Sequence, residues 1–198
     1  MIRLEEERDY KIVENLTREA FWNVYKPGCD EHYVLHIARK TKEFIKELSL
    51  VLEKDNHIIG HIMFMETYLQ AQTNIPIIIF GPVSIMPGYQ KQGYGTKLIS
   101  FAIEKAKSMG HKAIVITGDP DYYHRFGFLS AKHYDIHYNE FSDEELPFFM
   151  ALELEKGYFQ EPSLYRDPDV YLAAPHHVAK FDKAFPYKEK KVLPTQIF

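Results

Sequence analysis

The chain has 198 residues, of which 45% are hydrophobic and 26% are charged, and its formal net charge is −4. These values are typical of globular proteins and exclude wholesale disorder. The length fits one domain of ordinary size with a short extension. Because the charge is mildly acidic and mixed in sign, we expect neither a nucleic-acid-binding nor a membrane-surface protein.

The features that bear on location favour the cytoplasm. The longest strongly apolar run, residues 75–80, is far shorter than the roughly 20 residues that a membrane span needs. The first seven residues are acidic and lack the apolar core of a signal peptide. Cys29 is the only cysteine, so no internal disulfide can form, as is usual in a reducing compartment.

The first half of the chain is predicted to form helices followed by a strand hairpin and a further strand. Helical spacing of apolar residues marks the helices, and apolar runs mark the strands. The predicted elements are a short strand at 2–4, helices at 10–22 and 31–39, and strands at 48–53, 58–68 and 75–85. Gly81 and Pro82 lie inside the last of these strands and predict a bulge or a break in its pairing.

The second half is predicted to alternate helix and strand. A long amphipathic helix over 92–109 is followed by an all-apolar strand at 113–117, as expected of a strand buried on both faces. Asp119 is expected to cap a short helix that starts at Pro120. Strands near 134–138 and 149–155 should complete the sheet, and a short helix is expected near 178–184. The order predicts an α/β protein with a sheet of mixed direction.

A glycine-containing turn joins the strand at 75–85 to the long helix. Glycine lets the main chain approach a ligand closely. The free N–H groups of a first helical turn, together with the helix dipole, bind anionic oxygens. The turn therefore predicts a phosphate or pyrophosphate site, beside which Lys91 and Lys97 add positive charge. The residues of this turn are Gln90, Lys91, Gln92, Gly93, Tyr94, Gly95 and Thr96.

Neither the nucleotide P-loop pattern nor the three-glycine dinucleotide pattern is present in this turn. The pattern Gln90-x-x-Gly93-x-Gly95 instead resembles the motif with which the GNAT superfamily of N-acetyltransferases holds the pyrophosphate of coenzyme A. Residues 118–128 resemble the second signature of that superfamily, in which a tyrosine, here Tyr123, precedes Gly-Phe by four residues. Two matches in the right order over residues 48–130 carry the resemblance.

The resemblance implies a GNAT fold, with a mixed central sheet splayed between its middle strands and flanked by helices. It implies a GNAT acetyltransferase domain at 1–157, and we expect the proline-containing extension at 158–198 to pack on that domain. The implied reaction is direct transfer, in a ternary complex, of an acetyl group from acetyl-CoA to a primary amine. The partner would be a small-molecule or peptide amine, and family analogy adds a homodimer.

The same resemblance assigns roles to individual residues. The main chain of Val83, Ser84 and Ile85 would bind the pantetheine arm, and residues 90–96 would surround the pyrophosphate. Tyr123 would contact the cofactor and act as general acid, because a phenol has a pKa close to that of the departing thiol. The alternative for Tyr123 is a purely structural role in the core. Tyr122 is the neighbour that is most easily confused with Tyr123.

The general base is left open by the sequence. Many relatives carry a Glu on the strand before the pyrophosphate loop, but 75–85 has no acidic residue. Glu66, on the preceding strand, is the nearest candidate, and a solvated strand end is an equal alternative for it. Weaker candidates are His61, Asp119 and His124.

Two other classes of protein compete with the acetyltransferase. One is a non-catalytic acyl-CoA-binding regulator or scaffold, and the other is a dinucleotide-binding oxidoreductase, against which the missing third glycine argues. Metal binding is not expected, because no Asp, Glu or Cys completes a ligand set around the histidine pairs of spacing four.

Overall fold

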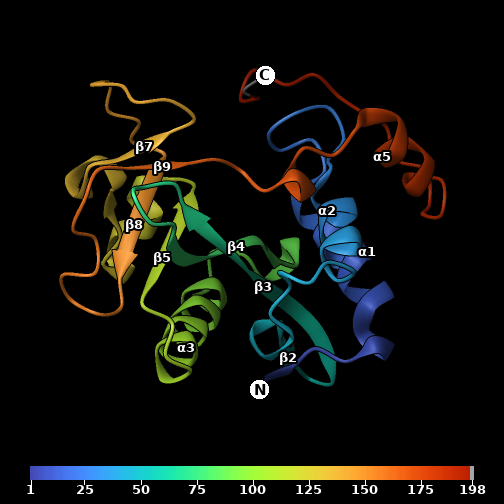
Figure 1. The fold of residues 1–198 in the computed structure, drawn as a ribbon. Helices are drawn as coiled ribbons and strands as arrows, with labels where there is room; N and C mark the ends of the chain where they lie inside the picture. The colour runs from blue at the N-terminus through green and yellow to red at the C-terminus, as the bar shows by residue number, and fades with distance from the viewer. Residues whose placement is uncertain (197–198) are drawn as a thin grey trace.

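The computed structural model describes residues 1–196, which form a seven-stranded mixed sheet between helices and a separate two-stranded sheet (Figure 1). The strand order in the large sheet is β1-β2-β3-β4-β5-β8-β6, and β4 and β5 are its parallel pair. Its strands are β1 (Ile2–Leu4), β2 (Leu50–Lys54), β3 (His57–Leu69), β4 (Ile75–Ile85), β5 (Ala113–Thr117), β6 (Leu129–Ser130) and β8 (Phe149–Glu153).

Helices cover both faces of the large sheet. The α-helices are α1 (Tyr10–Phe21), α2 (Glu31–Ala38), α3 (Tyr94–Ser108), α4 (Pro120–Tyr123) and α5 (Pro175–Asp182). One apolar cluster joins α1 and α2 to one face, and a second joins α3 to the other. The buried stripe of α3 contains the apolar residues that helical spacing predicts, among them Leu98, Ile99 and Ala102. Within residues 1–196, no helix has both the length and the apolar character needed to cross a membrane.

The predicted bounds of the strands at 75–85 and 113–117 are confirmed, but the prediction that a strand at 134–138 completes the central sheet is wrong. β7 (Ile136–Tyr138) pairs in parallel with β9 (Ser163–Tyr165) in the separate sheet, and β6 takes the edge place beside β8. Asp135, in the left-handed region with φ 55°, turns the chain away before β7 begins.

The large sheet is splayed between β4 and β5, as predicted. The two strands pair only through Ile78 with Ile114 and Ile79 with Val115. Beyond these pairs β3 is the one strand that pairs with β4 in the described chain, and Gly81 and Pro82 form a bulge there, since the register with β3 shifts between Ile62 and Phe64. Gly81 has φ 142°, which favours glycine, and Pro82 has no N–H to donate. A gap therefore opens between the carboxyl ends of β4 and β5.

Residues after Gly157 contact α1 and α2 in the described part of the chain. Nε of the buried Arg18 donates to Oδ1 of Asp182 at 2.7 Å. The indole N–H of Trp22 donates to the carbonyl of Glu189 at 3.0 Å. The helix expected near 178–184 begins earlier, at Pro175, a residue that favours the first helical position. The expected extension at 158–198 includes residues 197–198, which lie outside the described residues.

A buried ionic network around Glu5, the residue after β1, predicts that acid lowers the stability of the fold. Arg39 donates to both carboxylate oxygens of Glu5, at 2.5 and 3.2 Å, and Nε2 of His61 lies 3.4 Å from Glu5. Burial alone would raise the pKa of Glu5, but the charges and hydrogen bonds of His61 and Arg39 outweigh it and lower this pKa to about 2.

Because the pKa of Glu5 is lower in the folded protein than its ordinary value, its contribution is present above the ordinary pKa and is lost as the pH falls toward 2. We expect the free energy of unfolding to fall by about 3 kcal/mol more in the wild type than in Glu5→Gln between pH 6 and pH 2. Urea unfolding across this range measures the difference, and parallel curves for the two proteins would contradict it.

Candidate active site

The turn before α3 presents unpaired main-chain donors. Gly93 is the N-cap of α3 with φ 86°, and Lys91 also adopts a left-handed conformation with φ 59°. The first helical amide with an acceptor is that of Lys97, which donates to the carbonyl of Gly93 at 3.0 Å. Within residues 1–196, the amides of residues 93–96 have no hydrogen-bond partner. Such a row of free N–H groups at a helix N-terminus binds anionic oxygens.

The side chains of the turn leave these amides accessible. Gln90 Nε2 donates to the carbonyl of Ile85 at 2.9 Å, and Gln92 Nε2 donates to the carbonyl of Gly88 at 3.0 Å. Both amide side chains are therefore bonded to main-chain carbonyls and do not cap the free N–H groups. The predicted pyrophosphate site thus has the donors that its chemistry requires.

Gly95 is needed for a close contact. A Cβ at this position would lie 2.6 Å from the hydroxyl oxygen of Tyr122, on α4, but 3.8 Å from the Cζ atom of the same ring. A side chain at residue 95 would therefore displace the phenol or the helix. The glycine lets α4 pack against the N-terminus of α3, so the two predicted motifs meet in space.

Lys54, at the end of β2, adds positive charge to the rim of the turn, although no local sequence pattern marks it. Its Nζ lies 5.2 Å from the ring centroid of Tyr89 and 5.4 Å from that of Tyr94. The neighbouring phenol of Tyr94 raises the pKa of Lys54. Lys91 and Lys97 are exposed on the same turn and its helix. Positive charge therefore gathers around the free amides.

The last residues of β4 face the gap with their main chain. Val83, Ser84 and Ile85 pair with β3 on one edge, and the edge toward β5 has no strand partner. The hydroxyl of Ser84 is buried and donates to Oγ1 of Thr17 at 2.9 Å, so this side chain is turned toward α1. An extended ligand in the gap would find unpaired main-chain groups on β4.

Tyr123 lies at the mouth of this gap. Its ring centroid is 5.9 Å from that of Phe80 on β4, and a Cβ at Gly118, just after β5, would lie 2.4 Å from its ring. Burial, followed by the neighbouring Tyr122, raises the pKa of Tyr123, and its hydroxyl has no hydrogen-bond partner within residues 1–196. The phenol is therefore protonated at neutral pH and free to donate.

The structure does not bring Glu66 to this mouth. Glu66 pairs with Ile78, at the closed end of the gap, where β4 and β5 are still hydrogen-bonded. Of the weaker candidates, His61 is buried against Glu5, and Asp119 caps α4 by accepting from the amide of Asp121 at 3.0 Å. His124 is exposed.

Comparisons with known proteins agree with this geometry. Residues 12–128 match the model of the Acetyltransferase (GNAT) family. The chain is 33% identical over 82 residues to the uncharacterized N-acetyltransferase YjhQ of Escherichia coli, a match that spans 41% of this chain and only 45% of that protein. It is 27% identical to the uncharacterized N-acetyltransferase YhbS of Escherichia coli, over 69% of this chain and 77% of that protein.

Solved structures share the fold. A crystal structure of YhbS in complex with CoA has a TM-score of 0.75 and 22% identity, covering 87% of this chain and 92% of that one. A GNAT family acetyltransferase from Brucella melitensis in complex with acetyl-CoA has a TM-score of 0.70 and 26% identity, covering 86% of this chain and 97% of that one. With the family model matching more than half of its length, this chain belongs to the GNAT family of acetyltransferases.

Proposed function

We propose that this protein transfers an acetyl group from acetyl-CoA to a primary amine of a small molecule or peptide, directly and within a ternary complex. The observation that carries the proposal is the row of free amides at residues 93–96 beside the unpaired edge of β4. The similar structures from Escherichia coli and Brucella melitensis hold CoA and acetyl-CoA, which supports the same co-substrate here.

Two surfaces of the protein would bind acetyl-CoA. Residues 90–96, with Lys54 at the rim, would hold the diphosphate, and the main chain of Val83, Ser84 and Ile85 would bond the pantetheine arm. Acetyl-CoA supplies a thioester whose carbonyl carbon accepts the amine. The protein's contribution is to fix that carbon at the mouth of the gap and to leave one side of it open to the amine.

The transfer forms one C–N bond and breaks one C–S bond. The neutral amine supplies the electron pair, and its nitrogen gives up one proton to water as the amide forms. The hydroxyl of Tyr123 gives a proton to the departing sulfur and regains one from water, so the net products are the amide and the CoA thiol. Cys29 is unsuited to an acyl-enzyme route, because it is buried 3.4 Å from Nδ1 of His32 and burial raises the pKa of its thiol.

Glu66→Gln should leave kcat and the pH dependence of kcat/KM unchanged within about twofold, because the carboxylate lies at the closed end of the gap. Steady-state rates across pH 6 to 9 are the measurement. Loss of the acidic limb in this variant would restore Glu66 as the general base.

The proposed function is tested by titrating the protein with acetyl-CoA and with NAD in a calorimeter, then assaying thiol release over a panel of amines. We expect acetyl-CoA alone to bind and at least one primary amine to be acetylated. Acetyl-CoA binding with no thiol release from any amine would favour the non-catalytic regulator, and binding of NAD alone would favour an oxidoreductase.

A further inference from the structure

One segment of the chain crosses from the β5 side of the gap to the β4 side. At its start, the ring of Tyr165 lies 5.3 Å from that of Phe149, which pairs with Thr117 at the end of β5. Beyond it, the hydroxyl of Tyr171 donates to the carbonyl of Gly81, in the bulge of β4, at 2.7 Å. In Figure 1 this orange segment runs from β9 across the sheet toward α2.

Asp167 lies in the middle of this crossing segment and is surrounded by phenols. Its carboxylate accepts a hydrogen bond from the hydroxyl of Tyr138. Burial is the main cause that raises the pKa of Tyr138, Tyr165 and Tyr171, and the charge of Asp167 raises it further in all three. The carboxylate therefore acts on three phenols at once, from a half-buried position.

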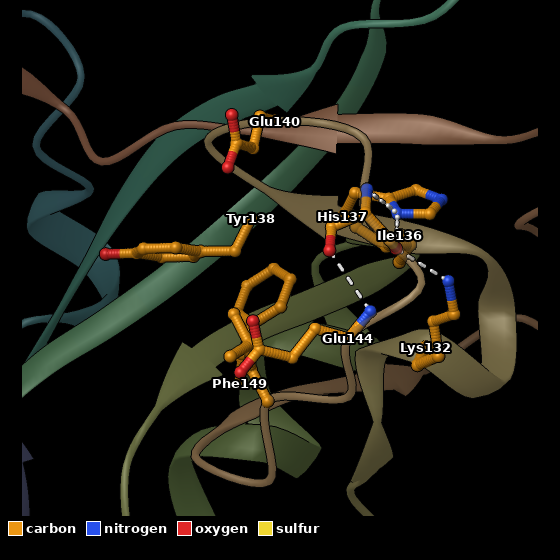
Figure 2. Close-up of a pocket in the computed structure, with 9 residues that line it drawn as sticks. Lys132, Ile136, His137, Tyr138, Glu140, Glu144 and Phe149 are labelled. Carbon is orange, nitrogen blue, oxygen red and sulfur yellow. Dashed lines mark hydrogen bonds between the residues drawn. The ribbon is translucent and has the colours of Figure 1, made fainter.

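No cation of the described chain neutralises this carboxylate. Within residues 1–196, Asp167 has no Lys, Arg or His nitrogen within 4.0 Å. Figure 2 shows that Tyr138 extends from β7 away from Lys132, on the turn before β7, and from His137, its neighbour on β7. Lys132 donates to the carbonyl of Ser142, and His137 pairs with Asp135 at 2.8 Å.

A half-buried carboxylate that has no cationic partner and lies among aromatic rings attracts a cation. Burial weakens the solvation of the carboxylate, so its electrostatic attraction for a cation is stronger here than between the same charges in water. The faces of the phenol rings add cation–π attraction. Tyr165 belongs to the apolar cluster on the α1 and α2 face and Tyr138 packs against it, whereas Tyr123 packs against the cluster on the α3 face. The carboxylate and the phenol acid thus flank the gap from opposite faces of the sheet.

We propose that Asp167, with the rings of Tyr138, Tyr165 and Tyr171, is the subsite for a second, positively charged group of the acceptor. The acceptor class is then an aliphatic diamine. The reacting nitrogen must be neutral, and a carboxylate beside it would favour its protonated form. The charge held by Asp167 therefore belongs to the other end of the molecule. This inference rests on the proposed function.

The test compares diamines with monoamines of the same chain length. Putrescine and cadaverine are paired with n-butylamine and n-pentylamine, both as acetyl acceptors and as ligands in calorimetric titrations of the full chain with CoA present. In the wild type we expect each diamine to exceed its matched monoamine by about tenfold or more in kcat/KM and in affinity. Asp167→Asn, which keeps an acceptor for Tyr138, should reduce both ratios to near one.

A control variant separates the charge of Asp167 from the other charge of its segment. Asp169→Asn removes an exposed carboxylate two residues away, so it should retain the preference for diamines. Equal wild-type behaviour of diamine and monoamine, or a preference that survives Asp167→Asn, would overturn the subsite. Asp167-dependent diamine binding without acetylation of any amine would leave the subsite standing and contradict the proposed function instead.

Discussion

Replacing Tyr123 with phenylalanine is expected to lower kcat by about 10²- to 10⁴-fold, the range over which a positioned general acid acts. Acetyl-CoA affinity should change by less than about threefold, because the ring that packs between Phe80 and Gly118 is retained. Single-turnover thiol release and calorimetry measure the two quantities on the same preparation. A drop in kcat with unchanged affinity for acetyl-CoA would mean that the hydroxyl stabilises the transition state and does not contribute to cofactor binding.

The raised pKa of Tyr123 also bears on how the activity depends on pH. Burial and Tyr122 raise the pKa of Tyr123, so the wild-type phenol stays protonated through neutral and mildly alkaline pH and its acid function is not lost there. Tyr158→Phe is a matched control, since its hydroxyl bonds the carbonyl of Pro76 at the closed end of the gap. Full activity in Tyr123→Phe, or an equal loss in Tyr158→Phe, would remove Tyr123 from the mechanism.

Gly95→Ala is expected to weaken acetyl-CoA binding by about tenfold or more, although alanine is the better residue for a helix. The new Cβ would lie 2.6 Å from the hydroxyl of Tyr122, so α4 or the first turn of α3 must move, and the free amides move with it. Calorimetric titration with acetyl-CoA gives the affinity, and circular dichroism checks that the fold is kept.

A second substitution tests the cause of this loss. Removing the hydroxyl in Gly95→Ala/Tyr122→Phe leaves Cγ1 of Ile85 at 3.7 Å and the ring Cζ at 3.8 Å as the nearest atoms, both at ordinary contact distances. The double variant should therefore recover most of the affinity that Gly95→Ala loses. If the double variant binds no better than the single one, the contact between Tyr122 and Gly95 does not control the site.

The sequence was most informative where local patterns are long and continuous. The bounds of β4 and β5 and the buried stripe of α3 follow from apolar runs and helical spacing. Gly81 and Pro82 marked the bulge because both residues disfavour regular pairing. The pairing of β7 with β9 was not predictable, since it joins two three-residue strands that lie far apart in the sequence.

In the site, too, residues in local motifs could be predicted and residues placed by distant segments could not. Residues 90–96 and Tyr123 stand in contiguous motifs, so the sequence could single them out as candidates. Glu66 stood on a suitable strand, but the register that places it opposite Ile78 depends on the bulge in β4. Lys54 and Asp167, the residue of the proposed subsite, lie on elements about 40 residues before and after the motifs, so no local pattern indicates them.

A crystal structure of this protein with acetyl-CoA tests the central claim most directly. We expect the diphosphate oxygens within hydrogen-bond distance of the amides of residues 93–96, with the pantetheine arm along Val83 to Ile85 and the acetyl carbon facing Tyr123. A diphosphate bound elsewhere, or a thioester outside the space between β4 and β5, would contradict the account.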